Sequence, residues 1–400
     1  MNVDKMINNG KWLWKIVIEL LKFYCLYPLA YLLYGRRNIW LVSENGATAR
    51  DNGYHFFKYL QENHPEIESF YVLKRDSADY SKVKSCGNIV HYKSFKHYCL
   101  FIVSKVQLST QIMGCSTDYH IYWWLIKKKK KCLLFRLKAK QVFLQHGVIK
   151  DAMPQFYKEN TGVDIFICGA KPEYDYICET YHYDNEVKYT GLARFDNLHN
   201  QVLKKQILVM PTWRNWLIYG EENGREEKIA QSNYVKCWNA LLNSQELDGL
   251  LEKTTVDLIF YPHFAMQKFI HLFSTTNRHV TIADINHFDV QRLLKESALL
   301  ITDYSSVYFD FAYMKKPLIY YQFDREEYRS KHYSKGYFDY DIMGFGEVVQ
   351  NEDQLLKCMK SYIDSDFKLN EKYAIRSNHF FPLHDKNNCE RIYQEVIKLF

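Results

Sequence analysis

The chain has 400 residues, a formal net charge of +7 and an apolar content of 47%, which allow two domains of ordinary size with well-filled cores. Its 10 cysteines are scattered and form no CxxC pair, a usage that indicates a reducing compartment and argues against a disulfide framework or a zinc site. The moderate positive charge fits an anionic partner, but no recognition module for nucleic acid is present, so nucleic acid is not expected as a partner.

Residues 12–34 form an apolar stretch that lacks a small-residue cleavage site and is interrupted by charge, so we expect no cleaved signal peptide. The longest uncharged part, Phe23 to Tyr34, is 12 residues long, short of the about 20 needed to cross a bilayer. The charged residues share one face of a helix; they are Lys11, Lys15, Glu19 and Lys22. Residues 1–37 therefore predict an amphipathic helix in the plane of a membrane, stopped near Pro28 and closed by Gly35, with packing on the protein's own core as the alternative.

A second patch favours the same location. Tyr122 to Ile126, which include two tryptophans, run directly into lysines 127–131, and Arg136, Lys138 and Lys140 follow. Tryptophan prefers the headgroup level of a membrane, and lysine attracts anionic lipid. We expect an anionic membrane surface as a partner and a peripheral position on the inner, cytoplasmic leaflet. A solvated charge run is the alternative.

From Ile39 onward, short apolar runs alternate with longer mixed segments, which predicts strands alternating with helices. The first series of predicted strands covers residues 39–43, 70–74, 88–92, 106–110, 142–145 and 165–169. The second series covers residues 207–210, 258–261, 279–282, 299–302, 318–321 and 347–349. Because alternating strands and helices build parallel sheets, the two series predict an α/β protein with two Rossmann-like domains.

The predicted join is the polar and basic segment Asn197 to Lys205. It gives a first domain at residues 38–200 and a second at residues 201–400. A final helix is predicted near Asn388 to Phe400, as a candidate to cross back to the first domain.

Polar side chains follow four of these strands at their C-terminal ends, the edge at which open α/β sheets bind ligands. The four motifs are GlnHisGly at 145–147 with Lys150, ProThrTrpArg at 211–214, ProHis at 262–263, and AspTyrSerSer at 303–306. The last precedes a predicted helix at 306–315, where free backbone N–H groups favour an anion. Simple capping of that helix by Asp303 and Ser305 is the alternative.

Together these motifs resemble those of the CDP-glycerol glycerophosphotransferases that build teichoic acids and related capsule polymers. The matching segments are ArgAspAsnGlyTyr from Arg50, GlnHisGly with Lys150, GlyLeuAlaArgPheAsp from Gly191, ProThrTrpArg from Pro211, TyrProHis from Tyr261, AspTyrSerSerValTyrPheAspPhe from Asp303, and LysProLeuIleTyrTyr from Lys316 with Asp324 and Tyr328. The resemblance covers most of the chain, and the serine motif is its most specific part. It implies a GT-B arrangement in which two Rossmann-like domains face a cleft.

The resemblance further implies transfer of glycerol phosphate from CDP-glycerol to a hydroxyl of a lipid-linked saccharide or polymer acceptor, with release of CMP. Such a reaction needs a base for the hydroxyl proton and positive charge around the diphosphate. We expect His146 to be the base, because it ends a strand and histidine titrates near neutral pH. A histidine bonded to backbone at a strand end is the alternative. His263 is expected as a second catalytic residue that, with Arg214, would hold the diphosphate.

The remaining donor-site candidates lie around the serine motif. Ser305 and Ser306 would complete the phosphate cradle, Thr212 would contribute from the neighbouring motif, and Asp303 would orient the turn. Asp51 and the asparagine that follows it are expected to form a capped turn on the acceptor side.

Four further residues match the family pattern. Arg194 is a candidate clamp for the donor phosphates, or alternatively an ion-pair partner of Asp196. Lys150 is a candidate anion contact, or alternatively a surface lysine. Asp310 and Asp324 are supporting residues without an assigned role.

No Asp-x-Asp motif stands at a strand end, the nearest being Asp339 to Asp341 in a Tyr/Gly-rich loop, so we expect no cofactor and a metal-independent site. Two alternatives keep the fold and change the donor, to CDP-ribitol or to a nucleotide sugar used by a GT-B glycosyltransferase. A non-catalytic protein that binds polymer at the membrane is a third. The motifs leave these open because they do not include the pocket for the transferred group.

Overall fold

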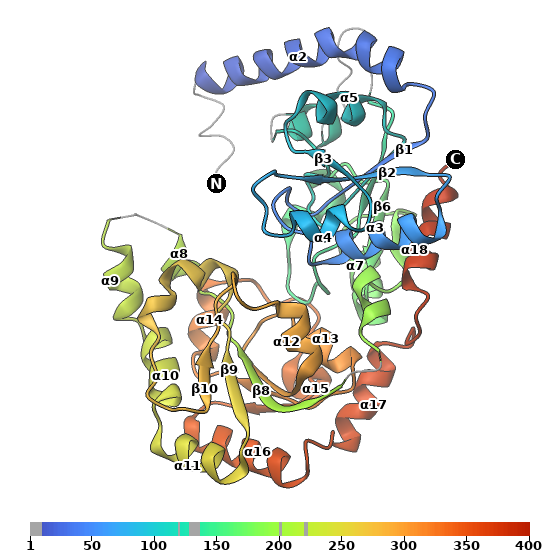
Figure 1. Ribbon diagram of the computed structural model, residues 1–400. Helices are drawn as coiled ribbons and strands as arrows, with labels where there is room; N and C mark the ends of the chain where they lie inside the picture. Colours follow the sequence, from blue (N-terminus) through green and yellow to red (C-terminus); the bar gives the residue numbers. More distant parts are fainter. Residues whose placement is uncertain (1–9, 119–120, 128–136, 200–201, 220–222) are drawn as a thin grey trace. The chain divides into compact units, whose positions relative to one another are not determined.

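The computed structural model describes residues 10–118, 121–127, 137–199, 202–219 and 223–400 (Figure 1). The chain forms two compact units: unit 1 comprises Met1–His146, Pro154–Asn197 and Asp385–Phe400, and unit 2 comprises Gly147–Met153 and Leu198–His384. One crossing between the units falls in the predicted join, and the last helix belongs to unit 1. The short segment that follows His146 belongs to unit 2, which the sequence did not reveal.

Unit 1 is built on a seven-stranded parallel sheet in the order β3-β2-β1-β4-β5-β6-β7. The strands are β1 (Ile39–Ser43), β2 (Glu68–Leu73), β3 (Asn88–His91), β4 (Val106–Ser109), β5 (Lys140–Phe143), β6 (Ile165–Cys168) and β7 (Val187–Tyr189). The first predicted series is present, and β7 is added at the edge. The strand order reverses between β1 and β4, and in open α/β sheets the C-terminal side of such a reversal is where ligands bind.

Four helices of unit 1 lie between these strands along the chain, and a fifth, α18, follows the whole of unit 2. They are α3 (Asn52–Asn63), α4 (Tyr80–Lys84), α5 (Phe95–Val103), α7 (Lys171–Thr180) and α18 (Asn388–Ile397), with short turns η1 (Tyr122–Lys127), η2 (Pro154–Phe156), η3 (Lys158–Asn160) and η4 (Ala193–Asn197). The start of α18 is bound by Asp196, which accepts hydrogen bonds from the backbone N–H of Asn388 (2.9 Å) and Cys389 (2.9 Å). Asp196 therefore anchors α18. The alternative prediction, an ion pair between Asp196 and Arg194, is not what these bonds show.

Unit 2 is built on a six-stranded parallel sheet in the order β10-β9-β8-β11-β12-β13. The strands are β8 (Lys204–Met210), β9 (Asp257–Phe260), β10 (Val280–Ile282), β11 (Ser297–Thr302), β12 (Leu318–Tyr321) and β13 (Glu347–Val349). These match the second predicted series. The strand order reverses between β8 and β11, which places the ends of these strands at the second ligand-binding edge.

Several helices of unit 2 begin at polar residues that cap them. They are α8 (Asn215–Ile218), α9 (Arg225–Ala230), α10 (Asn233–Leu242), α11 (Gln245–Thr254), η5 (Phe264–Leu272), α12 (Val290–Glu296), α13 (Tyr308–Tyr313), α14 (Arg325–Lys331), α15 (Tyr340–Met343), α16 (Glu352–Asp364) and α17 (Glu371–Phe380). Ser232, Ser244 and Asn351, for example, each accept a hydrogen bond from a backbone N–H of the first turn of α10, α11 and α16. The core is centred on Trp238, which is fully buried and packs edge-on against Tyr321 at 5.4 Å.

Helix α2 (Gly10–Tyr34) passes through Pro28 without a break, so the predicted stop there is wrong. Phe23 before the proline and Ala30 after it are both buried in the unit 1 core against α5, and this packing holds the helix together across the missing hydrogen bond. Glu19 accepts a hydrogen bond from the Tyr98 hydroxyl of α5 (2.8 Å), so one part of the predicted charged face contacts the protein.

The opposite face of α2 is an apolar stripe that is exposed to solvent. Trp14 is 67% exposed, Leu21 56% and Leu32 82%, and their spacing keeps them on one side of the helix. Further exposed residues of this stripe are Val17, Ile18, Leu29 and Leu33. Residues Trp14–Tyr34 are long and apolar enough to cross a membrane, with a mean hydropathy of 1.7 over the most apolar window. Such a helix is weak evidence for a membrane span, since core helices and signal sequences pass the same test.

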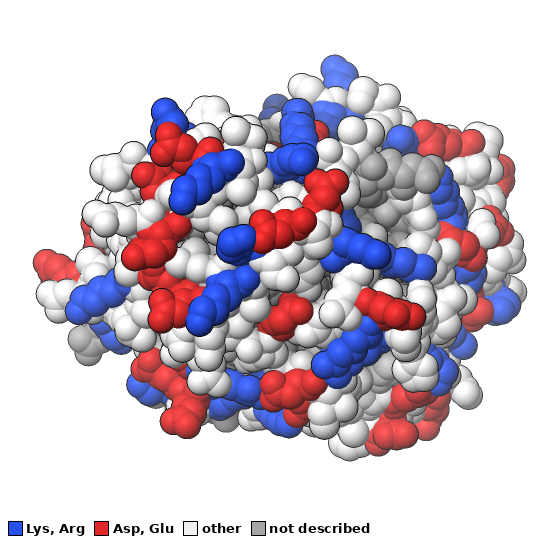
Figure 2. Space-filling view, turned by 90° about the horizontal axis from the view of Figure 1, so that it is seen from below, with Lys and Arg blue, Asp and Glu red and all other residues white. Residues whose placement is uncertain are grey.

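Among the described residues, the face drawn in Figure 2 has no basic patch that would indicate a site for anionic lipid. There, Lys and Arg side chains are interspersed with Asp and Glu side chains, so the excess positive charge is not gathered into one patch. Most of the predicted basic patch, Lys128 to Lys131 and Arg136, lies outside the described residues.

Gly191 is expected to be essential for the packing of α18 on unit 1. Its φ is +78°, and a Cβ added there would overlap the Asn388 side chain. We expect Gly191→Ala to lower the free energy of unfolding by about 1–3 kcal/mol, measured by urea denaturation. Gly249→Ala is the matched control, because a Cβ at that position of α11 meets no atom within 4 Å and should stabilise the helix by about 0.5–1 kcal/mol. Equal midpoints for both variants would contradict the close packing at Gly191.

Candidate active site

A loop that follows β1 is fixed by the carboxylate of Glu44. Glu44 is buried and accepts hydrogen bonds from the backbone N–H groups of Arg50 (3.0 Å), Asp51 (2.7 Å) and Tyr54 (3.2 Å). The Thr48 hydroxyl donates to the same carboxylate at 3.0 Å. The bond from Tyr54 satisfies one free N–H group in the first turn of α3, a task that the side chain of an N-cap residue usually performs. The side chain of Asp51, which occupies the N-cap position, is therefore left for another role.

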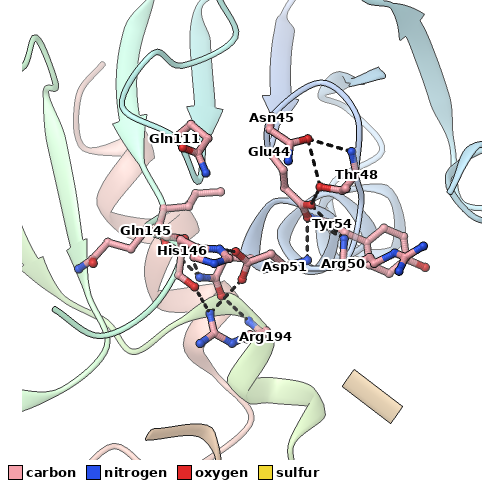
Figure 3. Close-up of polar contacts among 12 residues, drawn as sticks. Glu44, Asn45, Thr48, Arg50, Asp51, Tyr54, Gln111, Gln145, His146 and Arg194 are labelled. Atoms are coloured by element: carbon pink, nitrogen blue, oxygen red, sulfur yellow. Dashed lines mark hydrogen bonds and ion pairs between the residues drawn. The ribbon is translucent and has the colours of Figure 1, made fainter. Parts of the chain in front are cut away.

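Asp51 joins His146 and Arg194, as Figure 3 shows. One oxygen of the Asp51 carboxylate contacts Nδ1 of His146, and the other accepts a hydrogen bond from Nη1 of Arg194 at 2.9 Å. Nη1 of Arg194 also donates to the backbone carbonyl of His146 at 2.8 Å. Asp51 thus stands at the start of the helix, as predicted, but its side chain makes no capping hydrogen bond. The bond to Asp51 gives Arg194 a partner that neither of the two predictions for it had named.

Asn52 connects the same three segments through its side chain. Its Nδ2 donates to the carbonyl of Gln145 at 2.8 Å, and its Oδ1 accepts from the backbone N–H of Arg194 at 3.0 Å. The start of α3, the end of β5 and the turn η4 are thus held together, with Asp51 buried among them and His146 at the surface.

The chain turns sharply before His146. Gln145 has a φ of +60°, a backbone conformation that residues other than glycine rarely adopt and that occurs often at functional sites. Its buried side chain is held by the carbonyl of Ile167 (2.5 Å) and by Glu173 (3.0 Å). The turn leaves the His146 side chain 75% exposed, so Nδ1 is bound to Asp51 while the rest of the ring faces solvent.

The charges of Asp51, His146 and Arg194 shift the pKa values of His146 and Asp51 in opposite directions. The Asp51 carboxylate raises the pKa of His146 above its ordinary value. Burial alone would raise the pKa of Asp51, but the nearby His146 and Arg194 outweigh burial and bring that pKa below its ordinary value. An exposed imidazole whose other nitrogen is bound by an ionised carboxylate has the geometry of a general base.

The second cluster of predicted residues lies in unit 2, around Arg214. The guanidinium is fully buried and is bonded to Asp324 (Nε to Oδ2, 2.6 Å), to Asp303 (2.8 Å) and to the carbonyl of Thr212 (2.7 Å). Asp303 and Asp324 raise the pKa of Arg214 although burial opposes this, so the group stays charged. The predicted direct contact of Arg214 with a diphosphate does not fit this arrangement. Arg214 instead ties together the loops that follow β8, β11 and β12.

Asp303 orients the serine turn, as the sequence suggested. Its Oδ1 accepts from the backbone N–H groups of Thr212 (2.7 Å) and Tyr304 (2.6 Å). Ser305 and Ser306 are partly exposed and precede α13, which begins at Tyr308, two residues later than predicted. Thr212 Oγ1 is buried without a hydrogen-bond partner among the described residues. Hydroxyl groups thus lie after both strands at the reversal of the sheet.

His263 lies at the start of η5 and packs on Trp213, with ring centroids 6.1 Å apart. Its Nδ1 accepts from the backbone N–H of Ala265 at 3.2 Å, so in the neutral form the proton is on Nε2. His332, which the sequence did not single out, packs on the other side of this cluster, with its ring 5.0 Å from that of Trp213. Burial, aided by Arg214, lowers the pKa of His332 to about 3, so it is neutral at physiological pH.

The two remaining candidates are buried in unit 2. Lys150 pairs with Asp151, which also accepts a hydrogen bond from Arg329 at 2.8 Å, and burial lowers the pKa of Lys150. Lys150 is therefore not a surface lysine. Asp310 is buried within α13, at the first turn after the serines. In the described part of the chain, no group of three or more His, Cys, Asp or Glu residues could hold a metal ion.

Sequence reasoning missed Glu44 and the roles of Asp51 and Asn52, and it missed His332. The motif ArgAspAsnGlyTyr did contain Asp51 and Asn52, but only the fold shows that they meet the GlnHisGly motif. Glu44 follows an apolar strand as the histidine does, so its place at the end of β1 was an available signal.

A family model described as CDP-Glycerol:Poly(glycerophosphate) glycerophosphotransferase matches residues 26–398 of the chain. The minor teichoic acid biosynthesis protein GgaB of Bacillus subtilis (strain 168) is 33% identical over 380 residues, which cover 92% of this chain and 41% of GgaB. The chain therefore spans less than half the length of that relative.

Solved structures share the fold. A His-to-Asn variant of the wall teichoic acid polymerase TagF with CDPG superposes with a TM-score of 0.64 at 16% identity, covering 100% of this chain and 98% of that one. The UDP-GlcNAc 2-epimerase from Neisseria meningitidis bound to UDP-GlcNAc gives a TM-score of 0.52 at 11% identity, covering 90% of this chain and 100% of that one. The predicted fold class is confirmed in its two parallel-sheet α/β domains and its N-terminal apolar helix.

Removal of Arg214 is expected to act on stability first. Arg214→Met leaves two buried carboxylates, Asp303 and Asp324, without their counter-charge, so the free energy of unfolding should fall by about 3–5 kcal/mol in urea denaturation. Arg278→Met is the control: Arg278 also pairs with a carboxylate, that of Glu252, but its side chain is 71% exposed, and no measurable change is expected. A normal unfolding midpoint for Arg214→Met together with lost nucleotide binding would instead show that Arg214 contacts the donor directly.

Proposed function

Because the chain belongs to the CDP-glycerol:poly(glycerophosphate) glycerophosphotransferase family, we propose that it transfers glycerol phosphate from CDP-glycerol to an acceptor hydroxyl in the synthesis of a teichoic acid or capsule-type polymer, releasing CMP. The observation that carries the proposal is the Asp51–His146 pair at the C-terminal edge of the unit 1 sheet. The acceptor is a hydroxyl of a lipid-linked saccharide or of a polyol phosphate chain.

In the proposed reaction the acceptor oxygen attacks the phosphorus atom that carries glycerol. The new bond is between that oxygen and the phosphorus, and the bond between this phosphorus and the bridging oxygen of the diphosphate breaks, so that CMP leaves with the bonding electrons. His146 takes the hydroxyl proton through its exposed Nε2. Asp51 holds the ring by Nδ1 and stabilises the imidazolium that forms, and Arg194 holds Asp51 in place.

Donor binding is assigned to unit 2. The hydroxyls of Thr212, Ser305 and Ser306 and the Nε2–H of His263 would donate to the diphosphate oxygens. Arg214, Asp303 and Asp324 form the buried network that fixes these loops, which makes them positioning residues. Lys150 supplies positive charge from the 147–153 segment of the same unit, and Asp310 supports α13 from within. No metal ion is needed in this scheme.

The exposed apolar stripe of α2 supports a position at the membrane. A stripe of this length on a soluble surface is unusual, and one face of α2 is already docked on α5, which favours a helix that lies in the membrane plane over one that crosses it. We place the protein as a peripheral enzyme on the cytoplasmic face of the bacterial plasma membrane, where CDP-glycerol and lipid-linked acceptors meet.

The function is tested by CMP release. Purified protein is given CDP-glycerol, CDP-ribitol, UDP-glucose or UDP-N-acetylglucosamine, each with lipid-linked acceptor extract. CMP release from CDP-glycerol is expected. CMP release from CDP-ribitol alone would change the transferred group, and UMP or UDP release from a nucleotide sugar would make the protein a glycosyltransferase and refute the proposal.

The role of His146 is tested by substitution. His146→Ala should lower kcat by about 10²–10⁴-fold, the usual contribution of a general base, while binding of CDP-glycerol measured by calorimetry is unchanged. His182→Ala is the control, since His182 is also exposed and beside a carboxylate, that of Glu159, but lies away from the strand ends. Unchanged turnover of His146→Ala would exclude His146 as the base.

The pH dependence follows from Asp51. Since the Asp51 carboxylate raises the pKa of His146, the active neutral form of His146 is lost as pH falls through a value above the ordinary 6.5. Asp51→Asn removes this charge, so the acidic limb of kcat should move to lower pH while kcat at the optimum falls by about tenfold or more. An acidic limb at the wild-type position would show that Asp51 does not set the protonation of His146.

Membrane attachment is tested on the α2 stripe. The double variant Leu21→Asp, Leu32→Asp should bind vesicles of anionic lipid about a hundredfold more weakly in co-sedimentation, because two apolar side chains of the exposed face are lost. Ile375→Asp is the control, as Ile375 is 61% exposed but on α17 of unit 2. Resistance of the wild-type protein to extraction from membranes by alkali would contradict the in-plane position.

A further inference from the structure

Glu44 stands behind the Asp51–His146 pair and has a charge that no cation neutralises. Both oxygens of its carboxylate accept hydrogen bonds, and the donors are three backbone N–H groups and the Thr48 hydroxyl. These donors favour the ionised carboxylate, whereas burial and the neighbouring Asp51 raise the pKa of Glu44 above its ordinary value. No lysine, arginine or histidine in the described part of the chain forms an ion pair with it.

The other charges of the loop are paired. Nε of Arg50 binds Asp79 at 2.9 Å, and Arg194 binds Asp51 at 2.9 Å. The charged and titratable groups that surround His146 and this loop are Asp51 and Arg50 on the loop, Asp79 and Lys82 at α4, Tyr71 on β2, Tyr54 on α3 and Arg194 on η4. Of the charged groups that bind Asp51, Glu44 is negative and Arg194 is positive, and Lys82 donates to the carbonyl of Ala49 instead. A proton on His146 places a second positive charge beside the Asp51 carboxylate.

We propose that Glu44 is a positioning residue of the proposed reaction, which fixes the loop that carries Asp51 and makes His146 retain the proton that it takes from the acceptor. The first part follows from the hydrogen bonds, since every donor to Glu44 belongs to residues 48–54. The second follows from charge, because a buried anion favours the protonated state of a neighbouring base. The exposed ring of His146 can then release the proton to water after each turnover.

The inference rests on the proposed function only for its kinetic readout. Glu44→Gln removes the charge and keeps the side-chain length. We expect kcat to fall by about tenfold, the acidic limb of kcat to move to lower pH by roughly one unit, and KM for CDP-glycerol to stay unchanged. Glu44→Asp, which restores the charge, should return the acidic limb toward the wild-type pH.

Asp79→Asn is the matched control. Asp79 is also a buried carboxylate that binds this loop, but its partners are the backbone N–H of Ala49 (3.0 Å) and Arg50, whereas Glu44 binds Asp51 itself. Asp79→Asn should therefore lower stability without moving the acidic limb. A limb that stays in place for Glu44→Gln, or moves equally for Asp79→Asn, would overturn the proposal.

A second readout does not depend on turnover. The pKa of His146 is measured by NMR titration of the ¹⁵N-labelled full chain, with the His146→Ala variant used to assign its signal. A lower pKa of His146 in Glu44→Gln is expected, and an equal pKa would refute the role of Glu44 even if the protein proved to have another activity. Conversely, a shifted pKa without CMP release would refute the proposed function and leave the role of Glu44 intact. Circular dichroism of each variant shows whether it is folded, and Glu44→Asp provides the test if Glu44→Gln is not.

Discussion

The carboxylate of Asp51 is the point on which the unit 1 site depends. It binds His146 with one oxygen and Arg194 with the other, and its own backbone N–H is held by Glu44. Each of these residues comes from a different part of the chain, and a parallel sheet is what brings the ends of their strands to a common edge. Since Asp51 is buried, both of its ion partners are needed to keep it charged at neutral pH.

Unit 2 uses a buried ion network in a similar way but with the sign reversed. Here a single cation, Arg214, collects carboxylates from the loops after β11 and β12, while aromatic rings such as Tyr304 and Tyr328 lie against its faces. Such a network is costly to desolvate, and here it joins the loops that follow three neighbouring strands. The hydroxyls of Ser305 and Ser306 are left at the surface of this rigid base.

Much of the fold could be predicted, because buried parallel strands read as short apolar runs between helices. The strand β7 was missed because Val187 is its only apolar residue besides Tyr189, and β7 lies at the sheet edge. The helix α2 was cut short because Pro28 normally ends a helix, whereas burial of Phe23 and Ala30 on both sides keeps it intact. The sequence identified the motif residues, but their roles depend on which side chains lie close together in the fold. Nothing in the sequence shows that Arg214 is buried, or that Asp51 and His146 meet across 95 positions.

The path of the chain has a consequence for biosynthesis. Residues 385–400 pack on unit 1, where the start of α18 is bound by Asp196 and lies against Gly191, yet they are translated after all of unit 2. The nascent protein therefore leaves the ribosome with the parts of α3 and η4 that α18 covers still exposed, while nearly two hundred residues are still to be folded. Closing so long a loop adds little equilibrium cost, because the entropy grows only with the logarithm of loop length, but it delays completion of unit 1. During that interval unit 1 lacks the buried side chains of Cys389 and Ile392. Chaperones would therefore bind a first domain whose core is still incomplete.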